Sequence, residues 1–152
     1  MTLKIVDRPA ITVVGLQIRA TPMSPDIPAL WPRFVARIPE IAHTTEPRVT
    51  YGVMQDVAGA AQFDYLAGVA VSAADTLPAG MTRVELPAGP YAFFTYPLSR
   101  LGEGFGEIFG KLLPASGHRP RPGPYFERYN EDFCPDKPDS LVEIWLPISV
   151  NS

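Results

Sequence analysis

Residues 48–72, RVTYGVMQDVAGAAQFDYLAGVAVS, contain two runs rich in β-branched and aromatic residues with a stretch of small residues between them. The runs 48–56 and 63–72 are typical of strands, and the small residues VAGAA at 57–61 are typical of a loop. The segment therefore predicts a β-hairpin with a loop of several residues, and the remaining elements can be placed around it.

A strand and a helix are predicted before this hairpin. Residues 9–21 begin with β-branched residues and then alternate apolar and polar side chains, as a half-buried strand does. We expect Asp26 to cap a helix that starts near residue 28, runs to about residue 42 and is disturbed by Pro32 and Pro39. Its apolar residues recur at three- and four-residue steps and form one face: Leu30, Phe34, Val35, Ile38 and Ile41.

The second half of the chain repeats this order. Residues 81–98 predict two extended pieces broken at 87–90, followed by a helix that Ser99 caps and that Pro114 and Gly117 end near residue 113. Residues 125–133 and 141–148 predict two more strands, joined by the polar turn 134–140. The apolar face expected for the second helix consists of Leu101, Phe105, Ile108, Phe109 and Leu112.

These elements predict an α+β fold made of a tandem strand-helix-strand-strand repeat. We expect one domain over residues 1–152, with pseudo-repeats at about 1–78 and 79–152. Two such units would join into one continuous antiparallel sheet with both main helices packed on it. The groove between the halves is then the expected place for a small-molecule cleft.

The composition indicates a single folded domain rich in strands and turns. With 46% hydrophobic residues the 152-residue chain can bury one core, and its 18 prolines exclude a helical bundle. The net charge of −3 argues against direct binding to nucleic acid. Cys134 is the single cysteine and the N-terminus shows no secretory leader, so we expect a cytoplasmic protein. The longest apolar stretch, 65–74, is too short to span a membrane.

The segment YFERY at 125–129 carries the strongest signal for binding chemistry. In a strand, Tyr125, Glu127 and Tyr129 share one face. A carboxylate flanked by aromatic rings suits a lipophilic cation, because the rings supply apolar area and a negative π face while the carboxylate supplies the opposite charge. The alternative is a surface glutamate beside two half-buried tyrosines.

Other aromatic residues are candidates for the wall of the same site. In the last strand Glu143 and Trp145 lie on one face, and Trp145 would add a ring wall if it points into the same groove as Glu127. We expect Glu143 itself to face water. Tyr51, Tyr65, Tyr91 and Phe93 are further candidates for the pocket. Trp31 and Phe105 could also line it, but their helical spacing favours the core.

Metal, cofactor and nucleophile chemistry find little support in the sequence. The two histidines, His43 and His118, are 75 positions apart, and with one cysteine no spacing resembles a zinc site or a Cys-His pair. The glycines of GEGFGE at 102–107 lack the strand and the spacing of a dinucleotide-binding loop. We therefore expect no metal and no cofactor.

A set of short tags, in order along nearly the whole chain, resembles the GyrI-like small-molecule-binding domain. The tags are YGV at 51–53, FDYLAG at 63–68, LPAGM at 77–81, LPAGPYA at 86–92, LLPASG at 112–117, FERY at 126–129 and VEIWLPI at 142–148. This domain is the effector-binding module of many AraC-type and MerR-type multidrug regulators, and it occurs alone in gyrase-inhibitor proteins.

The resemblance implies a central cleft that binds amphipathic, aromatic and often cationic compounds. In that family a buried acidic residue on a central strand meets the positive charge of the ligand, and the matching position here is Glu127. Burial in an apolar groove should raise the pKa of this carboxyl. The candidate ligand-binding residues are Glu127, Tyr51, Tyr65, Phe93, Tyr125, Tyr129 and Trp145.

Three functions remain open from the sequence. Because the repeat fills nearly all 152 residues, we expect a standalone module that holds a small molecule for multidrug sensing or sequestration. The alternative is a hydrolase acting on a bound electrophile, with Glu127 as general acid or base and Tyr51 or Trp145 positioning the substrate. The third is a protein-interaction factor whose partner is gyrase or a separate regulator. Neither nucleic acid nor a membrane is an expected direct partner.

Overall fold

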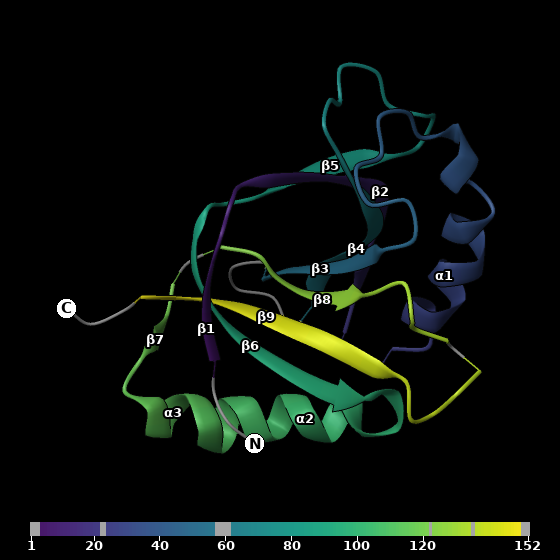
Figure 1. The fold of residues 1–152 in the computed structure, drawn as a ribbon. Coiled ribbons are helices and arrows are strands. Elements are labelled where there is room, and N and C mark those ends of the chain that lie inside the picture. Colours follow the sequence, from purple (N-terminus) through teal and green to yellow (C-terminus); the bar gives the residue numbers. More distant parts are fainter. Residues whose placement is uncertain (1–3, 22–23, 57–61, 122, 135, 150–152) are drawn as a thin grey trace.

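The computed structural model of the protein describes residues 4–21, 24–56, 62–121, 123–134 and 136–149, and Figure 1 shows an antiparallel sheet that curls into a half-barrel. Eight strands follow one another in the order β1-β6-β9-β8-β3-β4-β2-β5, and β7 pairs with β9 beside them. The strands are β1 (Lys4–Arg8), β2 (Ile11–Ala20), β3 (Thr50–Asp56), β4 (Phe63–Val71), β5 (Thr82–Leu86), β6 (Gly89–Pro97), β7 (Arg119–Pro120), β8 (Tyr125–Tyr129) and β9 (Leu141–Ser149).

Two helical segments lie outside the curl of the sheet (Figure 1). One is α1, followed by a 3₁₀ turn, and it packs on β2 and β4. The other is a continuous series that packs on β6. The segments are α1 (Asp26–Val35), η1 (Ile38–Glu40), η2 (Leu98–Arg100), α2 (Leu101–Glu107), η3 (Ile108–Leu112), which is π-helical, and α3 (Leu113–Ser116). The predicted α+β fold with an antiparallel sheet and two main helices is confirmed.

The strand order follows the tandem repeat. The strand, helix and two strands of the first unit are β2, α1, β3 and β4, and those of the second are β6, the α2-α3 series, β8 and β9. Their strands lie in the order β2-β4-β3 and β8-β9-β6, so the two units meet where β3 pairs with β8. Each unit is extended at its outer edge by a strand that precedes the other unit in the chain. Strand β1 precedes the first unit but pairs with β6 of the second, and β5 precedes the second unit but pairs with β2 of the first.

The predicted hairpin at 48–72 is present as the β3-β4 pair, with Tyr51 opposite Gly68 and Asp56 opposite Phe63. Its loop, residues 57–61, lies outside the described residues. The sequence did not predict β1. Four of its five residues are exposed, so the strand carries no alternation of buried and exposed side chains.

The first helix is shorter than predicted. It ends at Val35, which is 53% exposed rather than part of the buried face. Pro39 explains the early end, because it has no N–H to donate to the carbonyl of Val35. The expected cap is also wrong: Pro25 precedes the helix and Asp26 is its first residue, with its N–H donating to the hydroxyl of Ser24 at 3.2 Å.

The second helix departs from ideal periodicity in its middle. Ser99 lies in a 3₁₀ turn and caps nothing, and the helix continues past Pro114 to Ser116 before Gly117 ends it in a left-handed conformation. The π-helical segment inserts one extra residue per turn. Leu113 is therefore buried, whereas Phe109, predicted on the buried face, is 44% exposed.

Strand β8 ends at Tyr129, four residues earlier than predicted, because Asn130 begins a turn. The side-chain carbonyl of Asn130 accepts the N–H of Asp132 at 3.0 Å, and its backbone carbonyl accepts the N–H of Phe133 at 3.0 Å. The turn brings the chain back to β9, which pairs with β8 as the sequence predicted.

The core divides between the two faces of the sheet. On the face covered by the helices, hereafter the helix face, Leu30 and Phe34 of α1 and Ile108 and Leu113 of the second helix contact the strands. On the opposite face the curl brings together residues from strands at both ends of the sheet, in a cluster that includes Tyr51, Tyr91, Phe126 and Trp145. Successive residues of the central strands therefore point alternately into the two parts of the core.

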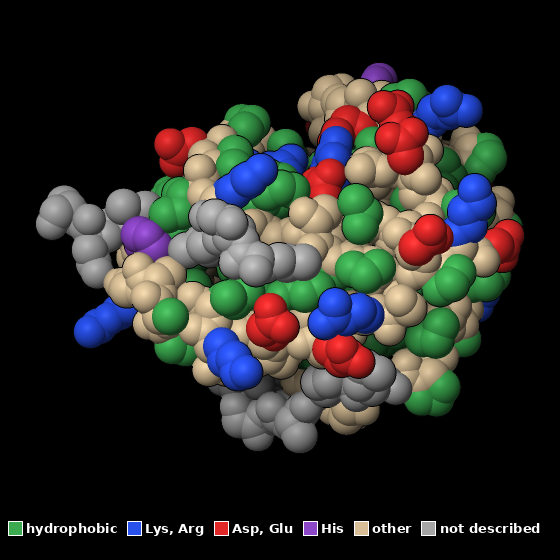
Figure 2. Space-filling model, turned by 60° about the horizontal axis from the view of Figure 1, so that its bottom comes forward, with side chains coloured by type: hydrophobic (Ala, Val, Ile, Leu, Met, Phe, Trp, Pro, Cys, Tyr) green, Lys and Arg blue, Asp and Glu red, His purple; other side chains and the backbone are tan. Residues whose placement is uncertain are grey.

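The surface shows charges of both signs. Acidic and basic side chains lie interspersed on the side of the molecule seen in Figure 2. Among the helices of the described residues, none has the length and hydropathy needed to cross a membrane.

Two glycines of α2 provide a matched test of helix packing. A Cβ on Gly104 would lie 2.6 Å from Cγ of Tyr96, so we expect Gly104→Ala to destabilise the protein by about 1–3 kcal/mol. A Cβ on Gly106 would meet nothing within 4 Å, and Gly106→Ala should stabilise it by about 0.5–1 kcal/mol through helix propensity. Urea unfolding measures both, and equal effects of the two substitutions would contradict this packing.

Candidate functional site

The site is built around Glu127 in the middle of the sheet. Strand β8 lies between β3 and β9, and Glu127 is paired with Gly52 on one side and Ile144 on the other. Its side chain is on the helix face and is 5% exposed. Among the residues that the structure describes, it is the one charged or polar residue that is buried. A carboxyl in this position needs hydrogen-bond donors, because burial removes its water.

Two tyrosines supply those donors. The hydroxyls of Tyr65 and Tyr129 donate to Oε1 of Glu127 at 3.1 and 3.0 Å. The indole N–H of Trp31 in turn donates to the hydroxyl of Tyr65 at 3.1 Å. Both tyrosines donate to the same carboxyl oxygen, and Oε2 is outside this chain of hydrogen bonds.

Burial controls the protonation of this group. Desolvation raises the pKa of Glu127 from its ordinary 4.5 to about 7, although the two tyrosine hydrogen bonds act in the opposite direction. Burial, together with the nearby Glu127 charge, raises the pKa of Tyr65 and of Tyr129 well above the usual value. The tyrosines therefore remain hydrogen-bond donors, while the carboxyl gains or loses its proton near neutral pH.

Gly52 makes room for the carboxyl from the neighbouring strand. A Cβ at this position would lie 2.4 Å from the hydroxyl oxygen of Tyr65 and 2.8 Å from Oε1 of Glu127. Any larger residue would push apart the groups that form the hydrogen bond. The sequence analysis missed this role, and the only signal for it is the glycine inside the strand-like run YGV.

Trp31 of α1 belongs to the site rather than only to the core. Its ring lies edge-on to Tyr129 and Tyr65, with centroid distances of 5.3 and 6.4 Å. The indole therefore lies against both tyrosines that hold Glu127. The apolar spacing of the helix predicted that Trp31 lies in the core. The one feature of the sequence that could have indicated a role in the site is its indole N–H, which usually finds a hydrogen-bond acceptor when it is buried.

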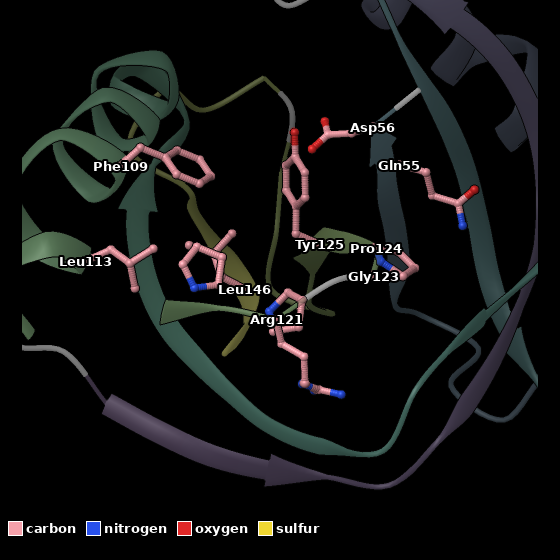
Figure 3. Close-up of a pocket in the computed structure, with 11 residues that line it drawn as sticks. Gln55, Asp56, Phe109, Leu113, Arg121, Gly123, Pro124, Tyr125 and Leu146 are labelled. Carbon is pink, nitrogen blue, oxygen red and sulfur yellow. The ribbon is translucent and has the colours of Figure 1, made fainter. Parts of the chain in front are cut away.

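An open pocket of about 650 Å³ lies next to Tyr125, and Figure 3 shows the residues that line it. Tyr125 lines it and is two residues from Glu127 on the same strand face, or about 7 Å along the strand. The ring of Phe109 lies 6.1 Å from that of Tyr125. Glu127 does not line the pocket. The lining residues are Gln55, Asp56, Phe109, Leu113, Pro120, Arg121, Gly123, Pro124, Tyr125, Leu146 and Pro147.

Rings and one carboxylate define the chemistry of the pocket. Figure 3 shows Phe109 and Tyr125 beside Leu113 and Leu146, whereas the side chain of Arg121 points away. Burial, followed by the negative charges of Asp56 and Glu127, raises the pKa of Tyr125 to about 12. The pocket therefore offers apolar and aromatic surface, and Tyr125 in its wall lies near the negative charges of Asp56 and Glu127.

Three of the candidate residues lie on the opposite face of the sheet. Tyr51 is paired with Arg128, and Trp145 is paired with both Phe93 and Phe126. Residues directly opposite in a sheet point to the same face, and Phe126 and Arg128 alternate with Glu127. The structure thus brings Glu127 together with Tyr65, Tyr125 and Tyr129, and it does not bring Tyr51, Phe93 or Trp145 to the same groove.

The expectation that Glu143 faces water is wrong. Its side chain is 13% exposed, and its Oε2 lies 3.1 Å from Nη1 of Arg128. The indole N–H of Trp145 also donates to its Oε1, at 3.0 Å. Arg128 accounts for the difference. It lies directly opposite Glu143 in the β8-β9 register and supplies a partner that the sequence analysis did not consider.

Metal ligands do not converge in the part of the chain that the structure describes. No group of three or more His, Cys, Asp or Glu side chains there is placed to hold a metal ion. The groups that the structure brings together at the helix-face site are a carboxyl, phenols and an indole.

Comparisons with known proteins agree on the fold. The transcriptional regulator BrlR of Pseudomonas aeruginosa is 36% identical over 151 residues, which are 97% of this chain and 56% of BrlR, so the chain spans little more than half of that relative. The structure of SAV2435 bound to tetraphenylphosphonium is similar, with a TM-score of 0.76 at 16% identity, covering 98% of this chain and 94% of that protein.

A hydrolase from Listeria innocua also shares the fold, with a TM-score of 0.58 at 11% identity over 97% of this chain and 91% of that protein. At such low identities the two solved structures bear on the fold alone. Residues 1–149 match the family described as the GyrI-like small molecule binding domain. The chain therefore belongs to the GyrI-like small molecule binding domain family.

Proposed function

We propose that this protein binds an aromatic, amphipathic cation, for which Glu127 is the counter-charge and the pocket beside Tyr125 holds the aromatic body. The observation that carries the proposal is the burial of one carboxyl among tyrosines and an indole. Burying such a carboxylate without a counter-charge costs free energy. A cation that needs no hydrogen bonds of its own offsets this cost when it lies against the carboxylate.

The free energy involved can be estimated from the pKa of Glu127. A rise from 4.5 to about 7 means that burial disfavours the ionised form by about 3 kcal/mol. A monovalent lipophilic cation within contact distance recovers this energy by direct attraction in a site of low polarity. A neutral ligand of the same shape recovers none of it, so the site selects for positive charge.

The shape of the site supports an aromatic ligand. The pocket volume of about 650 Å³ lies within the range of small-molecule sites, and the rings of Phe109 and Tyr125 offer faces on which an aryl group can pack. Tyr125 lines the pocket and lies two residues from Glu127 on the same face of β8, so a ligand that fills the pocket can extend along this strand toward the carboxyl. SAV2435, which shares the fold, has been solved with a cation of this class, tetraphenylphosphonium.

We place this binding in multidrug sensing or sequestration. The supporting comparison is the similarity to BrlR, a transcriptional regulator of which the chain spans 56%. A gyrase or regulator partner and a cytoplasmic location remain predictions of the sequence analysis.

Hydrolysis is the second candidate, and one observation favours it. A carboxyl with a pKa of about 7 is well suited to act as a general base near neutral pH. The residues expected to position a substrate, Tyr51 and Trp145, lie on the other face, so this role would pass to Tyr65 and Tyr129. Hydrolysis is tested by incubating an aryl epoxide with the protein and following it by mass spectrometry. A hydrolysis product that forms with the wild type but not with Glu127→Gln would support a catalytic role of Glu127.

The charge of Glu127 is tested by Glu127→Gln, which keeps the shape of the side chain. We expect its affinity for tetraphenylphosphonium, measured by calorimetry at pH 8, to fall roughly 10- to 100-fold, because the counter-charge is lost. The control is Glu103→Gln, which removes an exposed carboxylate and should bind as the wild type does. An unchanged affinity in a folded Glu127→Gln protein would refute the role of Glu127.

The aromatic part of the pocket is tested by Tyr125→Ala with two cations of different size. Affinity for tetraphenylphosphonium should fall by roughly 10-fold, as expected when ring packing worth about 1.4 kcal/mol is lost. Binding of tetramethylphosphonium, which has no aryl group, should change little. A similar loss for both cations would mean that Tyr125 acts through the fold and not through the aromatic body of the ligand.

Affinity should depend on pH through Glu127. Below about pH 7 the free protein carries a protonated Glu127, so a cation must displace a proton and affinity rises by up to tenfold per pH unit. Above about pH 7 the carboxyl is already ionised and affinity levels off. Calorimetry in buffers of different ionisation enthalpy should detect proton release at pH 6 and none at pH 8.5, and Glu127→Gln should abolish the difference.

The same pKa affects stability without a ligand. Between 4.5 and about 7 the folded protein holds a proton that the unfolded chain has released, so stability falls as pH rises through this window, by about 3 kcal/mol in all. Urea unfolding between pH 4.5 and 8 should show a shallower decline for Glu127→Gln than for the wild type. Identical pH profiles would contradict the raised pKa.

A further inference from the structure

A second group of rings and carboxylates lies on the opposite face of the sheet and already holds a cation. The guanidinium carbon of Arg8 lies 4.5 Å from the ring centroid of Trp145 and 5.2 Å from that of Phe126. Its Nη2 donates to the hydroxyl of Tyr51 at 3.5 Å. We call these residues the Arg8 cage: Tyr51, Phe126 and Trp145, with the carboxylates of Glu46 and Glu143 behind them.

The charges of the cage are balanced only when Arg8 is present. Arg128 contacts Oε2 of Glu46 at 2.7 Å and Oε2 of Glu143 at 3.1 Å. The hydroxyl of Tyr51 donates to Glu46, and the indole of Trp145 donates to Glu143. The carboxylates of Glu46 and Glu143 are thus balanced by two guanidinium groups, those of Arg128 and Arg8. Without Arg8 the cluster would have a net charge of −1 beneath exposed ring faces, which is a binding site for a cation.

In the strand that carries Arg8, this residue is the one that is not exposed. Within the described part of the chain, β1 is an edge strand whose five residues pair with β6 and with no second strand. Its other residues, from Lys4 to Asp7, are exposed, and Ile5 leaves 43% of its surface open to water. Arg8 is therefore the residue through which the side chains of this strand contact the cage.

The geometry of the cage suits a guanidinium better than a compact ammonium. The rings of Phe126 and Trp145 are nearly parallel, 10° apart, so a planar cation can lie against them. The hydroxyl of Tyr51 accepts from the rim of that plane. A hollow of about 340 Å³ beside the cage is lined by Glu46, Arg128 and Glu143 among others, and it leaves space for the remainder of a ligand.

We propose that the Arg8 cage is a second binding site, specific for guanidinium cations such as an arginine side chain, and that Arg8 occupies it in the resting protein. A ligand enters by displacing Arg8 while β1 shifts at the edge of the sheet. The proposal shares no residue with the helix-face site around Glu127. It therefore stands or falls independently of the function proposed above.

The two tryptophans allow each site to be observed separately. The protein contains two, and the indole N–H of Trp31 bonds to Tyr65 on the helix face whereas that of Trp145 bonds to Glu143 in the cage. Their indole signals in a ¹⁵N–¹H spectrum, assigned with Trp31→Phe and Trp145→Phe, report on the two faces. The probe is N-acetyl-arginine amide, titrated into the full chain and into Arg8→Ala.

We expect Arg8→Ala to bind the probe saturably, with a shift of the Trp145 indole signal and no shift of the Trp31 signal. The wild type should bind at least about tenfold more weakly, because its cage is filled more than nine-tenths of the time. Lys4→Ala, which removes a charge from the same strand but keeps Arg8, should match the wild type. Arg8→Lys, which keeps both strand and charge, should bind the probe with intermediate affinity.

Four results would overturn the proposal. These are absence of saturable binding to folded Arg8→Ala, equal affinity in Arg8→Ala and the wild type, a shift of the Trp31 signal in place of the Trp145 signal, and equal affinity for N-acetyl-lysine amide. Loss of tetraphenylphosphonium binding in Glu127→Gln bears on the helix face only. The failure of either site is therefore distinguishable from the failure of the other.

Discussion

The burial of the Glu127 carboxyl is the constraint on which the rest of the site depends. Two tyrosine hydroxyls reach one of its oxygens, and Trp31 holds one of those hydroxyls in turn. The neighbouring strand leaves space for the carboxyl at Gly52, where a side chain would collide with the hydroxyl of Tyr65 and with Oε1 of Glu127. Because these groups come from α1, β3, β4 and β8, they fix the helix and three strands relative to one another at the junction of the two units.

The register of β3 against β8 separates two kinds of chemistry. Gly52 faces Glu127 and Tyr51 faces Arg128, so adjacent residues of β8 direct opposite charges to opposite faces. A slip of one residue would place Arg128 among the tyrosines of the helix face and Glu127 beside Glu46 and Glu143. Both faces bury their side chains in packed clusters, and this double burial makes the register specific.

Alternation within one strand was enough to predict that Tyr125, Glu127 and Tyr129 share a face, and the resemblance to a family singled out Glu127. Alternation does not give the phase of one strand relative to another. For that reason Trp145 could not be assigned to a face before the β8-β9 register was known. The roles of Gly52 and Trp31 depend on contacts between distant segments. Strand β1 was missed because its exposed side chains have no period.

The two faces hold their carboxylates in different ways, and this determines what a ligand must displace. Glu127 is deep and lacks a basic partner among the described contacts, so a proton is its resting counter-charge near neutral pH. Glu46 and Glu143 are partly exposed and paired with Arg128, and the guanidinium of Arg8 lies over the neighbouring rings of Phe126 and Trp145. On these proposals a cation exchanges with a proton on the helix face and with another cation in the Arg8 cage. The first exchange therefore varies with pH around 7, whereas the second depends on how firmly an edge strand is held.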